Sequence, residues 1–370
     1  MNRTDSKYLR LLHKILTEGV IKGDRTGTGT KSIFHHTLEM DMADGFPLLT
    51  TKKMFTKGIL HELLWLLNGD TNIKYLVENG VHIWTGDAYK KFRNNVMEKC
   101  KAETKLPPVE YLSKNADLLS KEEFTEKIKT DEAFAKEWGE LGPIYGKQWV
   151  GWGSYEDKFE YIDNGKDEPV GARMSYDGIN QIQNAIDMLN NNPDGRRIMV
   201  SAWNVGEISK MTLPPCHWAF ELYTEELTWQ ERMDICDNKE KGNITPFTEI
   251  IIHAQLDYWG VPKRKLSLKW HQRSVDTGLG LPFNIASYGF LLHMFAQQVN
   301  MIPDKLIGDL TNVHIYLNHL EALEGQLDRK GGDLPTLKLN KAKDIFSYSF
   351  DDFEICDYKP DLKITMALSN

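Results

Sequence analysis

The segment Leu213-Pro214-Pro215-Cys216-His217 places one cysteine directly after two prolines and before a histidine. Consecutive prolines fix φ and remove two backbone donors, so the chain cannot be helical immediately before Cys216. The apolar run Trp218-Ala219-Phe220 that follows is typical of a strand. We therefore expect Cys216 at the mouth of a sheet, with its thiol held in one direction.

Two interpretations of Cys216 are open at this point. The simpler one is a buried structural cysteine, because free cysteines mostly behave as small core hydrophobes. The other is a nucleophile, because a thiol with an ordinary pKa of about 8.5 is activated when arginines or a helix N-terminus favour its thiolate. The arginines found elsewhere in the chain favour the nucleophile.

Length and composition bound the class of protein. A chain of 370 residues with 41% hydrophobic content can bury a substantial core, in one large domain or two. No apolar run approaches the roughly 20 residues that span a bilayer, and the first residues lack the apolar core of a signal peptide. We expect no membrane segment.

The cysteines and the net charge exclude further classes. Cys100, Cys216, Cys236 and Cys356 are scattered, without the spacing of a Cys/His metal site. This favours a reducing, cytoplasmic compartment and no bound metal. A net charge of −8 without a dense Lys/Arg block argues against a general nucleic-acid surface. Any anion site must be local.

Helices and strands are intermixed without regular βαβ alternation, which predicts an α+β fold with a mixed sheet and flanking helices. Apolar spacing predicts helices over Asp5–Thr17 (with Asp5 as N-cap), Lys57–Asn68, Asn72–Asn79, Asn180–Asn191, Leu281–Val299 and Asn318–Asp328. Strands are expected at Phe46–Thr51, Arg196–Trp203, Leu266–Ser274 and Val313–Tyr316. Residues 1–370 form one catalytic domain in this interpretation, with a helical insertion at about 87–140 and a second insertion at about 224–264.

Three features carry possible chemistry but are ambiguous by themselves. The loop around Arg25, Arg-Thr-Gly-Thr-Gly-Thr, lacks the ending of a Walker loop, yet an arginine at its tip suits a phosphate clamp. The pair Arg196-Arg197 is either a solvated strand end or two forks for a phosphate. Glu62 lies in a leucine-rich helix, and its spacing alone favours a solvent-facing position over a polar pocket.

Taken together, these motifs resemble those of the thymidylate synthase family, from the N-terminal helix almost to the end of the chain. The matching segments are Arg25–Thr30 (RTGTGT), Arg196-Arg197, Leu213–His217 (LPPCH), His271–Asp276 (HQRSVD), Leu279–Tyr288 (LGLPFNIASY) and His314–His319 (HIYLNH). The resemblance implies a homodimer whose mixed sheets pack face to face, with active sites built from both chains. The two insertions interrupt it.

The resemblance also implies roles for single residues. Cys216 would add to C6 of the uracil of dUMP, so that C5 can attack the one-carbon unit of the co-substrate 5,10-methylenetetrahydrofolate. Asn284 would read the uracil edge, while Glu62 and Tyr145 would serve the proton-transferring water network, which replaces the solvent-facing expectation for Glu62. The remaining implied contacts are Arg25, Arg273 and Ser274 with the 5′-phosphate, Arg196 and Arg197 with it from the partner subunit, His314 and Tyr316 with the 3′-hydroxyl, and Asp276, Gly280, Trp84 and Ile83 with folate.

Departures from the family pattern leave an alternative open. Thr85 and Asn312 stand where synthases usually have Asp, as does Asn180, and the chain ends in the polar pair Ser369-Asn370. A site that admits water would give 5-hydroxymethyl-dUMP, as in the deoxyuridylate hydroxymethyltransferases of some bacteriophages. The reductive methylation that yields dTMP and dihydrofolate remains the main prediction. A nucleotide-binding relative without catalysis is disfavoured, because Cys216, Glu62 and Asn284 are all present.

Overall fold

The computed structural model describes residues 1–103, 119–153, 178–237 and 249–367. The chain forms two compact units. Unit 1 comprises Met1–Met54, Ile182–Val200 and Ala219–Ala367, and unit 2 comprises Phe55–Gln181 and Ser201–Trp218. In the sequence, the boundary between the units falls within strands β3 (Met199–Ser201) and β4 (His217–Glu226).

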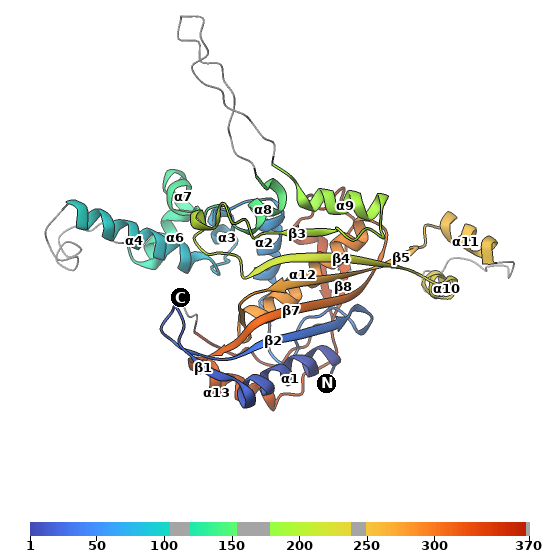
Figure 1. Ribbon diagram of the computed structural model, residues 1–370, viewed down its shortest axis with the longest axis horizontal. Coiled ribbons are helices and arrows are strands. Elements are labelled where there is room, and N and C mark those ends of the chain that lie inside the picture. Colours follow the sequence, from blue (N-terminus) through green and yellow to red (C-terminus); the bar gives the residue numbers. More distant parts are fainter. Residues whose placement is uncertain (104–118, 154–177, 238–248, 368–370) are drawn as a thin grey trace, which may run out of the picture. The chain divides into compact units, whose positions relative to one another are not determined.

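A mixed sheet organises unit 1 (Figure 1). Its strands follow the order β1 (Val20–Lys22), β2 (Thr30–Asp41), β7 (Ile302–Tyr316), β5 (Arg264–Gln272), β4 and β3, and β6 (Val275–Asp276) pairs with β7. Strand β2 runs antiparallel to β7, whereas β5 and β6 run parallel to it. The mixed sheet with flanking helices confirms the predicted α+β class.

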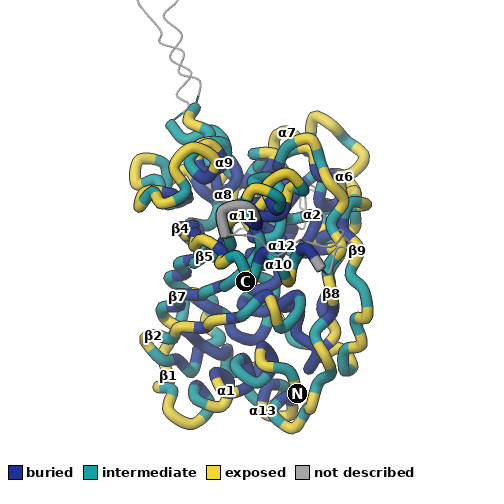
Figure 2. The backbone as a smooth tube through the Cα atoms, turned by 90° about the vertical axis from the view of Figure 1, so that its right-hand side faces the viewer, coloured by how far each residue is buried: buried dark blue, intermediate teal, exposed yellow. Residues whose placement is uncertain are grey.

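One face of this sheet is the core of unit 1. Alternate residues of β5 are buried on that face, among them Leu268 and Trp270. Helix α12 (Gly280–Gln298) packs against β5, β6 and β7, and the ring of its Tyr288 stacks on Trp270 with centroids 5.4 Å apart. Figure 2 shows the contrast between β7, where buried residues alternate with half-buried ones, and the exposed edge strand β1.

The beginning of helix α1 (Arg3–Glu18) corrects the predicted N-cap. Asn2 is the N-cap, and its side chain accepts a hydrogen bond from the backbone N–H of Asp5. Asp5 is fully buried instead, and its carboxylate accepts hydrogen bonds from the backbone and hydroxyl groups of Thr50 and Thr51 at 2.6 to 3.2 Å. A carboxylate that serves a distant loop is unavailable as a cap.

The same contacts explain why the strand predicted at Phe46–Thr51 is wrong. The segment has no regular secondary structure, bends at Thr50 and Thr51, and pairs with no strand in the described part of the chain. Pro47 has no N–H to donate, and the backbone N–H groups of Thr50 and Thr51 are taken by Asp5. These backbone N–H groups therefore donate to a side chain and are not available to a neighbouring strand.

Two further expectations fell short at the sheet. The short strand predicted at Val313–Tyr316 is the end of β7, which begins at Ile302, and β2 was not anticipated at all. The middle of β2 reads His35-His36-Thr37 and is exposed or half-buried, so it lacks the apolar alternation by which strands are recognised.

The other predicted elements of unit 1 are confirmed within a few residues. They are α9 (Gln181–Asn191), β5, α12 and α13 (Leu320–Leu327). A small separate sheet pairs β8 (Thr336–Leu339) with β9 (Phe353–Cys356). The segment 224–264 contributes α10 (Trp229–Asp237) and α11 (Glu249–Tyr258), whose own small core includes Cys236, Ile252 and Leu256.

Unit 2 is helical in its described part. It contains α2 (Thr56–Leu67), α3 (Lys74–Glu78), α4 (Thr85–Glu103), α6 (Lys121–Thr130), α7 (Glu132–Trp138) and α8 (Tyr145–Gly151). Helix α2 ends as predicted, with Asn68 as C-cap and Gly69 at a φ of 67°. Phe92, Phe124 and Phe134 lie 5.3 to 5.8 Å apart in ring contacts, so α4, α6 and α7 share an aromatic core.

No described helix combines the length and the apolar character that a membrane span needs.

The Asp5 contacts generate a stability prediction. Asp5→Ala leaves the buried donors of Thr50 and Thr51 without their charged acceptor, so we expect the free energy of unfolding to fall by about 3 kcal/mol. Urea denaturation measures this. As a control, Asp44→Ala removes only a surface ion pair with the largely exposed Arg3, for which we expect less than about 0.5 kcal/mol. Equal losses in the two variants would contradict the role given to Asp5.

Candidate active site

Cys216 lies immediately before β4, as its prolines predict, and is half-buried. Its backbone N–H donates a hydrogen bond of 2.7 Å to the hydroxyl of Tyr145, the first residue of α8. Tyr145 is itself buried, and its ring lies against that of His217 with centroids 4.3 Å apart. The backbone of the cysteine is thus fixed from two sides, by its prolines and by a buried phenol.

His217 does not supply positive charge to this group. Burial lowers the pKa of its imidazole to about 3, because a desolvated ring resists gaining a charge. The ring is therefore neutral near pH 7. Cationic stabilisation of a Cys216 thiolate would have to come from arginines and not from the neighbouring histidine.

Glu62 is partly buried within α2, which corrects the solvent-facing position that its spacing alone favoured. The indole Nε1–H of the buried Trp84 donates to Glu62 Oε1 at 2.8 Å. Desolvation raises the pKa of this carboxyl to about 7, and the bond from Trp84 opposes that rise. Glu62 is accordingly poised to hold or release a proton near neutrality.

Aromatic contacts place these unit 2 residues in one neighbourhood. The ring of Trp84 meets that of Tyr145 edge to face at 6.0 Å. Trp84 therefore links Glu62 to Tyr145, and Tyr145 in turn holds the backbone of Cys216. Sequence reasoning named all four residues, but the order of contacts depends on the fold.

Thr85, which differs from the Asp usual in the family, directly follows Trp84 in the sequence. Ile83 is half-buried and Thr85 is buried. Within the described chain, the hydroxyl of Thr85 has no hydrogen-bond partner. Ser369 and Asn370 lie outside the described residues, so the polar end of the chain is untested.

In unit 1, Asn284 is positioned by a residue that sequence reasoning did not single out. Its side-chain Nδ2 donates to Gln272 Oε1 at 2.9 Å, and the same oxygen accepts from Trp270 Nε1 at 3.2 Å. Gln272 also donates to the backbone carbonyl of Ser274. The only sequence signal for Gln272 was its place inside the HQRSVD motif. It orients Asn284 and braces the turn that carries Arg273 and Ser274.

His314 and Tyr316 stand near the end of β7. Nδ1 of the buried His314 lies 2.8 Å from the carbonyl of Asn312. A carbonyl only accepts, so Nδ1 donates this hydrogen bond, and in the neutral tautomer with this proton Nε2 is an acceptor. Asn312 adopts a φ of 50°, a left-handed conformation that asparagine tolerates better than most residues. The His314 and Tyr316 rings are 5.3 Å apart.

The turn before α12 contains Asp276 and Gly280. Asp276 accepts a hydrogen bond from the backbone N–H of Gly278 at 2.9 Å, and the buried Lys52 donates to the carbonyl of Gly278. Desolvation lowers the pKa of Lys52 to about 8, against the opposing charge of Asp276. No sequence motif marks Lys52, which directly follows the segment Phe46–Thr51 that was expected to be a strand.

The arginine loop is held by its own carboxylate. Asp24 accepts hydrogen bonds from the backbone of Thr26 and Gly29, each at 2.7 Å, while Gly27 and Gly29 have φ near 78°. Arg25 is exposed, as are Arg196 and Arg197, and Arg273 is half-buried. Among the described residues, no hydrogen bond or ion pair engages the guanidinium groups of Arg25, Arg196 or Arg197.

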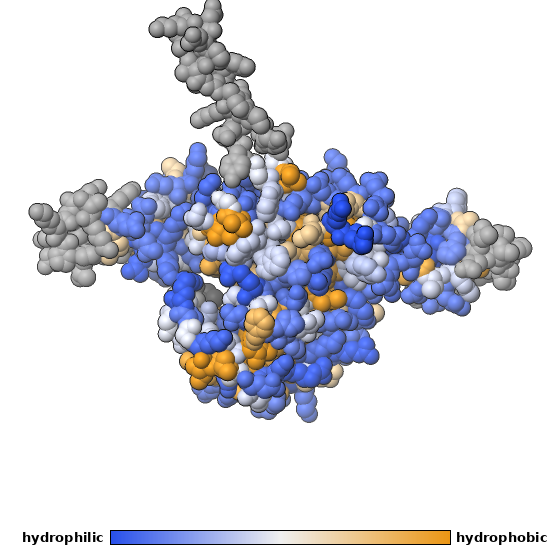
Figure 3. Space-filling model, viewed as in Figure 1, coloured by the Kyte–Doolittle hydropathy of each residue, from blue (hydrophilic) through white to orange (hydrophobic). Residues whose placement is uncertain are grey.

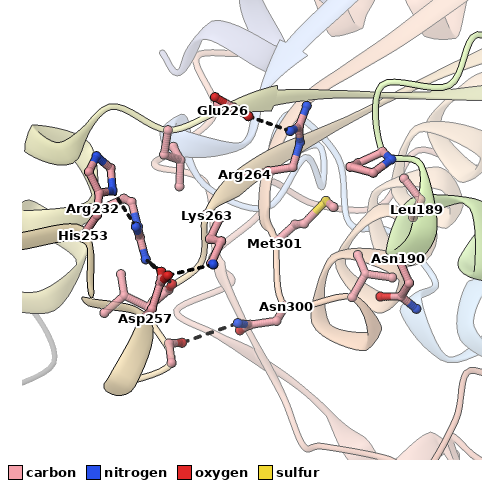
Figure 4. Close-up of a pocket in the computed structure, with 15 residues that line it drawn as sticks. Leu189, Asn190, Glu226, Arg232, His253, Asp257, Lys263, Arg264, Asn300 and Met301 are labelled. Carbon is pink, nitrogen blue, oxygen red and sulfur yellow. Dashed lines mark hydrogen bonds and ion pairs between the residues drawn. The ribbon is translucent and has the colours of Figure 1, made fainter. Parts of the chain in front are cut away.

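A cavity of about 510 Å³ in unit 1 contains none of these residues (Figure 4). It lies between the ends of α9 and α12 and the α10–α11 segment. Its charged wall centres on the buried Arg232, which donates to Asp257 at 2.6 Å, and Lys263 pairs with the same carboxylate. His253 Nδ1 lies 2.7 Å from Arg232 Nη1. The charged side chains of this wall pair with one another.

Glu62 yields a titration prediction. Trp84→Phe keeps a ring but removes the N–H that lowers the pKa of Glu62, so the pKa should rise above about 7. Carbon-13 NMR of labelled glutamate carboxyls would measure it, with Glu62→Gln identifying the signal. Trp65→Phe is the matched control, because that indole donates to the carbonyl of Asn72. A Glu62 pKa that is unchanged or lower in Trp84→Phe would contradict the assignment.

Comparison with known proteins gives a consistent result. The family model described as thymidylate synthase matches residues 6–370. A thymidylate synthase of Mycoplasma mobile is 41% identical over 365 residues, covering 98% of this chain and 99% of the relative. Those of Mesoplasma florum and Corynebacterium aurimucosum are 36% and 37% identical, with at least 97% of this chain and 98% of each relative covered. The chain therefore belongs to the thymidylate synthase family.

Proposed function

We propose that this protein is a thymidylate synthase, which transfers the one-carbon unit of 5,10-methylenetetrahydrofolate to C5 of dUMP and forms dTMP and dihydrofolate. Relatives named thymidylate synthase, matched over nearly their whole length, support it. They do not favour the hydroxymethyltransferase alternative. The observation that carries the chemistry is a cysteine with a fixed backbone in the same neighbourhood as a carboxyl that titrates near neutrality.

Cys216 is the nucleophile in this proposal. Addition of its thiolate to C6 of the uracil moves an electron pair to C5, which then bonds to the methylene carbon of the co-substrate. The bond from the methylene carbon to one folate nitrogen breaks as C5 bonds to it, and loss of the C5 proton then expels the second folate nitrogen and leaves an exocyclic methylene group. Hydride transfer from the released tetrahydrofolate reduces this group to methyl, oxidises the folate to dihydrofolate and expels the Cys216 thiolate. The prolines and the Tyr145 hydroxyl help by fixing the direction of attack.

Glu62 manages protons in this scheme. A carboxyl with a pKa of about 7 is present in both protonation states at neutral pH, so it can deliver a proton to the base and take one back through water. Tyr145, packed against Trp84 and His217, is the proposed phenolic member of the same relay.

The unit 1 residues recognise the nucleotide. Asn284, oriented by Gln272, would accept from N3–H of uracil and donate to O4 with its second amide hydrogen. His314 Nε2, left as an acceptor, suits the 3′-hydroxyl together with Tyr316. We assign the 5′-phosphate to Arg25, Arg273 and Ser274, with Arg196 and Arg197 supplied by a second subunit.

The folate contacts, the dimer and the domain plan complete the proposal. Asp276, Gly280, Trp84 and Ile83 are assigned to folate. The homodimer would pack the two sheets face to face. Residues 1–370 are taken as one catalytic domain, interrupted at about 87–140 and 224–264.

Product analysis tests the function directly. Incubation with dUMP and 5,10-methylenetetrahydrofolate should give dTMP by mass and one dihydrofolate per turnover by absorbance. Cys216→Ala should lower kcat by at least about 1,000-fold while dUMP still binds. Cys356→Ala, a half-buried cysteine on β9, is the matched control and should remain active. A hydroxymethyl product, or turnover by Cys216→Ala, would overturn the proposal.

Base recognition supplies a second test. Asn284→Asp loses the N–H that would meet O4 of uracil, and its carboxylate only accepts hydrogen bonds. We expect kcat/KM for dUMP to fall about 100-fold, and kcat/KM for dCMP to rise relative to that for dUMP. Asn300→Asp, elsewhere in unit 1, should leave both values unchanged. If the ratio of kcat/KM for dUMP to kcat/KM for dCMP is the same in Asn284→Asp as in the wild type, the assigned contact is refuted.

A further inference from the structure

Arg264, the first residue of β5, connects β4 to the segment that joins α9 to β3. Its Nε donates to Oγ1 of Thr224 on β4 at 2.9 Å, and its Nη1 lies 3.1 Å from Oε1 of Glu226 on the same strand. Its Nη2 donates to Oδ1 of Asp194, in the segment between α9 and β3. Figure 4 shows the contact of Arg264 with Glu226. All three nitrogens of one guanidinium group are therefore engaged.

Burial makes Arg264 the fixed member of these pairs. Its side chain is 12% exposed, whereas those of Asp194 and Glu226 are 74% and 80% exposed. A planar guanidinium holds its donors in a rigid fork, so bonds from all three nitrogens also fix the positions of their partners. Oγ1 of the buried Thr224 in turn donates to the carbonyl of Pro193 at 2.9 Å. Two successive residues between α9 and β3 are thus held from this side.

The segment held in this way carries the paired arginines. Asp194 stands two residues before Arg196. After the pair, the carbonyl of Ile198 accepts a hydrogen bond of 2.9 Å from the backbone N–H of Leu222 on β4. Arg196 and Arg197 lie exposed between these two anchors, and Figure 3 shows strongly hydrophilic residues on this face beside the segment that joins α9 to β3.

The α10–α11 segment positions Arg264 itself. The buried Arg232 of α10 donates to the backbone carbonyls of Val261 and Pro262, each at 3.1 Å, two residues before β5 begins. The insertion at about 224–264 therefore begins and ends at residues that hold the segment with the paired arginines. Neither the insertion nor Arg264 has a role in the proposed reaction so far.

We propose that Arg264 is a positioning residue for the 5′-phosphate of dUMP, and that it directs the side chains of Arg196 and Arg197 toward a second subunit. This rests on the proposed function, which assigns that pair to the phosphate held by the partner subunit. Two guanidinium groups bind one phosphate well only when both point at it, so a shifted segment loses affinity. Arg264 also neutralises Asp194, whose carboxylate would otherwise attract Arg196 and repel the phosphate.

Arg264→Met keeps an unbranched side chain and removes its donors. The KM for dUMP and the Kd of dUMP by calorimetry should rise about tenfold, with kcat changed less than about threefold, because binding is lost more than chemistry. Lys263→Met is the matched control, since it removes the neighbouring cation, whose ion pair is with Asp257 of α11. An unchanged KM in Arg264→Met, or an equal rise in Lys263→Met, would overturn the proposal.

Asp194→Asn breaks the same contact from its exposed end, so the variant should fold normally. The KM for dUMP should rise by less, about threefold, because no carboxylate is left beside Arg196. Glu226→Gln makes the same change at the other carboxylate on Arg264 and should leave the KM unchanged. The double variant of Asp194→Asn and Arg264→Met should have a KM no higher than Arg264→Met alone. A KM equal to the product of the two single effects would mean that Arg264 does not act through Asp194.

Mixed dimers show in which subunit Arg264 acts. When an Arg264→Met subunit is paired with a Cys216→Ala subunit by two affinity tags, the only site with a nucleophile receives its paired arginines from the Cys216→Ala subunit. Its KM for dUMP should equal that of the wild type. When both changes are placed in one subunit and paired with a wild-type subunit, the KM should be raised. The opposite order of the two KM values would contradict the proposal.

Binding of dUMP separates this inference from the proposed function. A chain that makes dTMP with the same KM and Kd for dUMP in the wild type and in Arg264→Met would refute the role of Arg264 alone. A chain that makes no dTMP, yet binds dUMP more weakly in Arg264→Met than in the wild type, would refute the reaction alone.

Discussion

Strand β7 is the constraint on which unit 1 depends. Its 15 residues pair with β2 on one side and with β5 and β6 on the other. Because buried backbone groups must find partners, the backbone hydrogen bonds to β7 set the positions of β2, β5 and β6. The strand also carries Asp309 on its open face and His314 near its end. Its left-handed residue Asn312 lies between them.

Burial acts on the unit 2 residues in one consistent direction, toward the neutral form. It raises the pKa of Glu62 to about 7 and lowers that of His217 to about 3. The first change creates a group that exchanges protons at physiological pH, and the second removes a charge beside Cys216. The proposed mechanism uses both effects, since it needs a proton carrier and assigns the positive charge to arginines.

The two faces of the sheet have different tasks. The face beneath α12 is apolar and closed by stacking such as that of Trp270 on Tyr288. The opposite face carries charged contacts, such as those of His271 with Glu221 and Asp309. Trp270 also donates to Gln272, which orients Asn284. The core face is therefore connected through Gln272 to the position of Asn284.

Local pattern in the sequence determined the α+β class, helices α2, α9 and α12, strand β5 and the place of Cys216, because apolar periodicity and proline act within a few residues. The family motifs identified most of the candidate site residues. Only the tertiary structure decided that Asp5 accepts hydrogen bonds from Thr50 and Thr51, that burial and the Trp84 N–H set the pKa of Glu62, and that Gln272 positions Asn284. Each of these depends on partners that are distant in sequence or on desolvation. Hydrogen-bond partners and burial follow from packing, which no local pattern records.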